Sequence, residues 1–207
     1  MDTGFLHKAA DTLREQYAGI SGEGVEIPVR VRGGAEEEEE APGGPPVEPL
    51  FPDQVDSLVQ LLDERLEAMA RGELYARGGE PPEELGNALN LDAGLILISL
   101  DETLGRGETA VEQLREVMRQ WGEMREESLP DEELEDFLRM AEEYRRAWRE
   151  FPEPEAFPFV VAIGATDAFM LAEESEPEAE EVARTASAML DDAARFYGEV
   201  SRILGAR

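Results

Sequence analysis

The residue types that carry most enzyme chemistry are nearly absent from this sequence. It contains no cysteine and a single histidine, His7, which lies beside Lys8 near the N-terminus. The lack of cysteine excludes thiol catalysis and thiolate metal sites, and one histidine leaves no conventional zinc site. The chain also offers no Ser–His–Asp or Cys–His combination to propose. We therefore predict a protein without catalytic residues, which is not an enzyme.

The motifs that bind nucleotides and calcium are missing as well. The sequence has no GxxxxGK[ST] phosphate loop, no GxGxxG between a strand and a helix, and no DxDxDG calcium loop. We predict no cofactor and no dedicated metal residues. Glutamate is so frequent, however, that a magnesium site made only of carboxylates stays open as an alternative, and a pair such as Glu142 and Glu143 carries little information.

Three aspartates interrupt segments that are otherwise apolar. Asp167 lies within the apolar run 157–171, where a buried carboxylate would need a hydrogen-bonding partner. Asp191 and Asp192 lie in the last predicted helix, and we expect both to face solvent. Of the three, Asp167 is the one with a case for function.

Arginines form one cluster, in the predicted helix that begins near Ser128 and ends at Phe151. Its members are Arg139, Arg145, Arg146 and Arg149, which lie close to Tyr144 and Trp148. Glu135 and Glu142 each precede one of these arginines by four residues, a spacing that favours surface ion pairs. The alternative is a docking patch for an acidic partner segment, the chain's own glutamate run included. On that interpretation Arg145, Trp148 and Arg149 are partner-binding residues.

The chain is strongly acidic. It has 49 acidic and 19 basic residues, a formal net charge of −30, and Lys8 is its only lysine. Such a charge disfavours direct binding to nucleic acid or to anionic membranes. Two explanations compete: adaptation to a salty or hot cytoplasm, as in halophilic proteins, or mimicry of DNA phosphates by carboxylates. The near absence of lysine favours the first, because a genome-wide bias explains it and mimicry does not.

Composition divides the chain into three parts. Residues 1–32 predict a helix over about 3–17, followed by the alternating segment VEIPVRVR (25–32), which is typical of an edge strand that needs a partner. Residues 33–50 combine glycine, proline and five consecutive glutamates, and they predict a disordered acidic linker. Residues 51–207 predict a helical-bundle body.

The body is a succession of segments with helical periodicity. We predict an all-α fold of about six helices, with a minor β element in the N-terminal part as an option. A helix over 53–71 should end at Gly72. Residues 94–100 and 157–164 are apolar enough to form buried strands, but their length and spacing favour helices. No segment has the apolar length of a transmembrane helix and the N-terminus does not look like a signal peptide, so we expect a soluble, cytoplasmic protein.

The last helix, over about 176–204, carries the most regular pattern. Seven apolar residues recur at alternating intervals of four and three, as in a coiled coil. We call them the seam: Val182, Ala186, Met189, Ala193, Phe196, Val200 and Ile203. Packing within the bundle is one explanation for the seam. The other is a surface that binds a partner or a second copy of the chain.

These features favour a non-enzymatic, partner-binding helical protein. It would be an assembly factor, resembling a chaperone in role, or a structural subunit, for example of a virus. Its partner would be another protein or a second copy of this chain, with no direct contact to nucleic acid or membrane. The alternative is an acidic DNA mimic that inhibits a nucleic-acid-binding enzyme.

Overall fold

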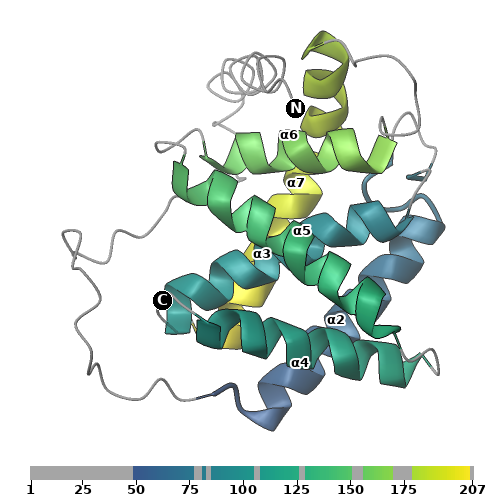
Figure 1. The fold of residues 1–207 in the computed structure, drawn as a ribbon. Coiled ribbons are helices and arrows are strands. Elements are labelled where there is room, and N and C mark those ends of the chain that lie inside the picture. The colour runs from purple at the N-terminus through teal and green to yellow at the C-terminus, as the bar shows by residue number, and fades with distance from the viewer. Residues whose placement is uncertain are drawn as a thin grey trace.

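The computed structural model describes residues 49–76, 81–82, 85–104, 108–125, 129–150, 156–169 and 179–205. Over these ranges the chain forms helices and no strand, which confirms the all-α prediction (Figure 1). The predictions made for residues 1–48 lie outside the described ranges. The helices are α2 (Pro52–Ala70), α3 (Leu85–Leu104), α4 (Glu108–Met124), α5 (Asp131–Glu150), α6 (Ala156–Phe169) and α7 (Ala179–Leu204).

Helix α3 lies at the centre, and each of the other five described helices packs against it (Figure 1). Every residue from Ala88 to Asp101 is buried. Helix α6 is also buried along nearly all of its length, where it packs between α3, α5 and α7. The segments 94–100 and 157–164 are thus helical, as the spacing indicated. Their continuous apolar character reflects burial on all sides of a helix rather than a buried strand.

Glycines set the closest approaches between these central helices. A Cβ atom added to Gly94 of α3 would lie 2.7 Å from the Cβ of Tyr144 in α5. One added to Gly164 of α6 would lie 2.7 Å from a methyl group of Leu91 in α3. Real Cβ atoms do not approach side-chain atoms this closely, so glycine at both positions lets the helix backbones meet. These two contacts hold α5 and α6 against the central helix.

The ends of α2 follow local sequence rules. Pro52 occupies the first turn, where its missing N–H is not needed, and the side chain of Gln54 accepts a hydrogen bond from the Phe51 N–H. Gly72, with φ of 68°, ends the helix in the predicted place. Its N–H donates to the Met69 carbonyl, and the next N–H donates to Ala68, the pattern of a Schellman motif.

The body begins one residue earlier than predicted. Leu50, which the sequence assigned to the linker, is buried in the core. Its backbone N–H donates a hydrogen bond of 2.9 Å to the side-chain oxygen of Gln113 in α4. The entry into α2 is therefore fixed against α4 before the helix starts.

Substitution of Gly94 tests the packing of the central helix. We expect Gly94→Ala to lower the free energy of unfolding by about 1–3 kcal/mol, because the new methyl group overlaps Tyr144. Gly198→Ala in α7 is the matched control, since a Cβ there meets nothing within 4 Å. The control should gain about 0.5–1 kcal/mol from helix propensity. Urea denaturation followed by circular dichroism measures both, and equal effects of the two substitutions would contradict this packing.

Candidate functional site

The seam lies inside the monomer. Six of its seven residues are fully buried, and Ile203 packs against the same core. Helix α7 uses this face to contact α2, α3 and α6. The structure therefore places the seam in bundle packing, the first of the two explanations that its spacing allowed. A second chain would have to displace α7 to reach these residues.

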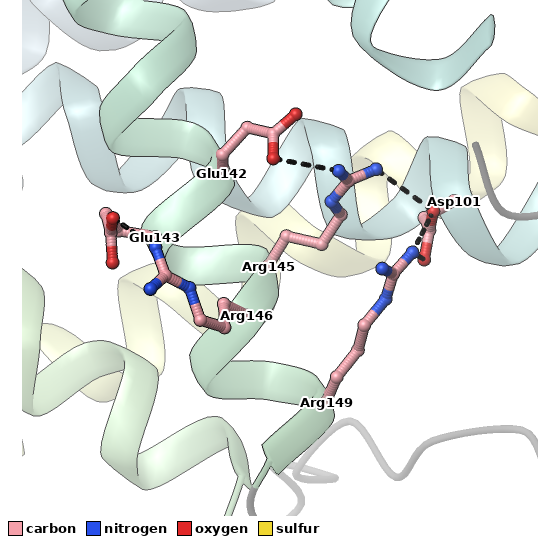
Figure 2. A network of polar contacts seen from close by, with 6 residues as sticks. All are labelled: Asp101, Glu142, Glu143, Arg145, Arg146 and Arg149. Carbon is pink, nitrogen blue, oxygen red and sulfur yellow. Dashed lines mark hydrogen bonds and ion pairs between the residues drawn. The ribbon is translucent and has the colours of Figure 1, made fainter. Parts of the chain in front are cut away.

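The arginine cluster is held by the protein's own carboxylates, as Figure 2 shows. Arg149 of α5 lies 2.6 Å from both carboxylate oxygens of Asp101 in α3, and Arg145 lies 3.4 Å from one of them. Arg145 also pairs with Glu142 at 3.0 Å. Asp101 is buried, so these contacts compensate a carboxylate in the core. Arg145 and Arg149 thus bind α5 to α3.

The other predicted members of the cluster are also engaged within the chain. The indole N–H of Trp148 donates to Glu102 at 3.2 Å, and the Trp148 side chain is buried against Phe157 and Tyr197. The ion pairs predicted at a spacing of four residues form at a spacing of three: Arg139 with Asp136, and Arg146 with Glu143. Arg145, Trp148 and Arg149 therefore stabilise the bundle. Arg145 and Trp148 are largely buried, whereas 35% of the Arg149 side chain remains exposed.

Asp167 has the partner that its burial requires. The hydroxyl of Tyr144 donates a hydrogen bond of 2.7 Å to the Asp167 carboxylate. Burial raises the pKa of Asp167 to about 6, while the bond from Tyr144 opposes this shift. The Tyr144 ring is the same one that packs against Gly94. Asp167 thus fixes the ring that sets the distance between α3 and α5, which is a structural role.

A second buried network lies between α2, α3 and the loop after α2. Arg65 of α2 makes two hydrogen bonds to the carboxylate of Asp92 in α3, at 2.6 and 3.1 Å. The hydroxyl of Tyr75 donates to the same carboxylate at 2.6 Å. Burial raises the pKa of Asp92, and the adjacent Arg65 guanidinium opposes this shift. Three hydrogen bonds from two residues therefore compensate a carboxylate with no solvent contact.

This network extends to α7. The Arg65 guanidinium lies 4.3 Å from the centre of the Phe196 ring, a cation–π contact. Tyr75 has φ of 51°, a left-handed conformation that a bulky residue rarely adopts. Its N–H donates to Asp192 of α7 at 3.3 Å. Asp192 is thus partly buried and bound, whereas Asp191 is exposed as expected.

Next to this network, α2 and α7 border a groove of about 500 Å³. Its volume falls in the range of ligand-binding sites, roughly 300–1,000 Å³. Apolar side chains and the buried Arg65 form part of its lining, and charged residues of α2 and α7 complete it. The full lining is Leu61, Glu64, Arg65, Glu67, Ala68, Arg71, Leu74, Asp192, Arg195, Phe196 and Glu199.

The charges along the groove are not balanced. Arg71 is bound by Glu67 and Glu73, and Arg195 lies 3.9 Å from Asp192. Glu64 of α2 and Glu199 of α7 are both exposed and form no ion pair with any other described residue. The groove therefore presents an apolar lining together with two carboxylates whose charge the described body does not neutralise. This combination suits a cationic, partly apolar segment.

Other kinds of site find no support in the described part of the chain. No group of three or more potential ligands among His, Cys, Asp and Glu is placed to hold a metal ion there. None of its helices combines the length and hydropathy needed to cross a membrane. The chain matches no protein-family model, and neither curated proteins nor solved structures show significant similarity to it. The groove is the candidate site on geometry alone.

One residue of α2 could have indicated the buried ion-pair network beside the groove from the sequence. Arg65 lies on the apolar stripe of α2, at the spacing that continues Leu58 and Leu62 toward Met69. A cation at a core position predicts a buried anion, although it does not indicate which acidic residue supplies that anion. Glu64 and Glu199 carry no such signal, because exposed glutamates occur throughout the chain.

Asp167 makes stability depend on pH. Its pKa of about 6 in the folded protein exceeds the ordinary value of 3.8, so the folded state binds more protons between these limits. The contribution of Asp167 to the free energy of unfolding is fully present below about pH 4, and it is lost as the pH rises through 6. Relative to Asp167→Asn, the wild type should lose about 1–3 kcal/mol between pH 4 and 7.5. Urea denaturation of both proteins at each pH measures this, and parallel pH profiles would contradict it.

Arg65 should be far more important to stability than the nearby exposed Arg71. Arg65→Met leaves Asp92 buried without its cation, and we expect a loss of about 3–5 kcal/mol. Arg71→Met breaks only exposed pairs, which solvent screens, so its effect on stability should be small. Adding Asp92→Asn to Arg65→Met should recover much of the loss, because the buried charge is gone. Thermal and urea denaturation test this, and equal costs of the two arginine substitutions would refute the network.

Proposed function

We propose that this chain is a non-enzymatic protein that binds a basic protein partner through the α2–α7 groove and the acidic surface around it. Its role would be that of an assembly factor, resembling a chaperone, or of a structural subunit. The observation that carries the proposal is the groove itself, with its apolar lining and the unneutralised carboxylates of Glu64 and Glu199.

The distribution of ion pairs supports a basic partner. Most described arginines are bound by carboxylates of the same chain, in the core or on the surface. Many exposed carboxylates form no ion pair with a described cation, including Asp53, Asp56, Glu132, Glu150 and Glu180. The resulting negative field attracts a cationic partner and repels anionic ones. Specific contacts would then come from the groove.

A DNA-mimic inhibitor is a special case of the same proposal. Its partner is also basic, but the partner surface is the one that holds DNA. Competition by duplex DNA separates the two cases, because DNA should displace this chain only from a partner that uses its nucleic-acid site.

Charge-neutral variants of the full chain test the proposal. We expect Glu64→Gln/Glu199→Gln to lose a basic protein that the wild type retains on affinity capture from extract of the source cells. Glu132→Gln/Glu150→Gln in α5 is the control, since it removes the same charge from exposed positions away from the groove. Quantitative mass spectrometry of the captured proteins is the measurement. If both variants retain the same proteins as the wild type, the groove is not the partner site.

A further inference from the structure

We propose that residues 25–32 of this chain, VEIPVRVR, dock in the α2–α7 groove. We call them the docking segment. The inference shares the groove with the proposed function but concerns the isolated chain, so it holds or fails without any partner. Three features support it: the chemistry of the groove, the sequence of the segment and the length of chain that joins them.

The chemistry of the segment matches that of the groove. Val25, Ile27, Val29 and Val31 supply apolar side chains at every second position, and Arg30 and Arg32 supply two cations. The groove offers the apolar side chains of Leu61, Ala68 and Leu74. Glu64 on one wall and Glu199 on the other are the carboxylates that lack a described cation. Two guanidinium groups and two carboxylates can form charge-assisted hydrogen bonds, the stronger kind.

The pattern of the segment also calls for a surface to cover it. Alternating apolar residues favour an extended chain with one apolar face, and Pro28 restricts it to an edge. The described part of the body contains no strand, and therefore no sheet edge on which such a segment could pair. An apolar groove between two helices is the surface that this body provides.

Residues 33–48, which connect the docking segment to the body, are long enough to span the distance from the start of α2 to the groove. Glu64 lies twelve residues into α2 from Pro52, which places it roughly 18 Å along the helix at 1.5 Å per residue. Residues 33–48 comprise six glutamates, four glycines, three prolines and three other residues. A Gly-rich chain of sixteen residues would have a root-mean-square length of roughly 22 Å, and proline and like charges extend a chain further. The tether is therefore long enough to reach the groove, and tethering raises the effective concentration of the docking segment there.

The acidic tether does not compete for the same position. In the arginine cluster of α5, Arg145, Arg146 and Arg149 are already paired with Asp101, Glu142 and Glu143, so the glutamate run 36–40 would have to compete with these carboxylates. Within the groove, the unneutralised carboxylates repel that run. Among the segments that precede α2, the basic one is therefore the complementary occupant.

Trypsin cleavage after Arg30 and Arg32 in the full-length protein reports on docking. We expect these bonds to be cut more slowly than in the free peptide of residues 25–35, and about fivefold faster in Glu64→Gln/Glu199→Gln than in the wild type. The Glu132→Gln/Glu150→Gln control should cleave at the wild-type rate. Early fragments are quantified by mass spectrometry, and circular dichroism verifies that both variants keep the wild-type helix content.

Two results would overturn the inference. One is cleavage of the wild type at the rate of the free peptide, or at the same rate in the groove variant. The other is protection that grows with protein concentration, which would mean that the segment enters the groove of a second copy.

If protection is found but no basic partner is captured, the docked segment stands and the proposed function fails. If capture depends on the groove but no protection is found, the proposed function stands and the docked segment fails.

Discussion

The burial of α3 on all sides is the constraint on which the rest of the structure depends. The stretch Ala88–Asp101 of α3 has no solvent-exposed face, so its carboxylates need partners from the elements that cover it. Asp92 is bound by Arg65 of α2 and by Tyr75, and Asp101 is bound by arginines of α5. Because an unpaired buried charge is far more costly than an unpaired surface charge, these two aspartates select where α2 and α5 can lie.

The need to neutralise buried carboxylates also affects the charge of the protein surface. Basic residues are scarce, 19 against 49 acidic ones, and several of them are used to neutralise carboxylates inside the bundle. The exposed face therefore keeps an excess of carboxylates, even beside the groove. The same Arg65 that compensates Asp92 also lines that groove and contacts Phe196 there. Arg65 therefore belongs both to the interior ion-pair network and to the lining of the candidate binding groove.

Periodicity in the sequence predicted the helices, because apolar spacing is a local property of the chain. It identified α7 from its seam, and it favoured helices for 94–100 and 157–164. Which residues pair with each other across the fold is not a local property of the chain. Arg65 and Asp92 are 27 residues apart, and nothing in the spacing distinguishes Asp92 from many other acids as its partner. The groove was also unpredictable, because it depends on how α2 and α7 are placed relative to each other by their contacts with α3.

The placement of the charges gives folding and binding opposite responses to salt. Buried pairs such as Arg65–Asp92 are screened little by dissolved ions, whereas repulsion among exposed carboxylates is screened strongly. Added salt should therefore leave the interior network intact and relieve the destabilising surface repulsion. The same screening weakens attraction between Glu64, Glu199 and any cationic segment. A salty environment would thus favour the folded body and make occupancy of the groove depend more on its apolar lining, on Leu61 and Leu74, than on charge.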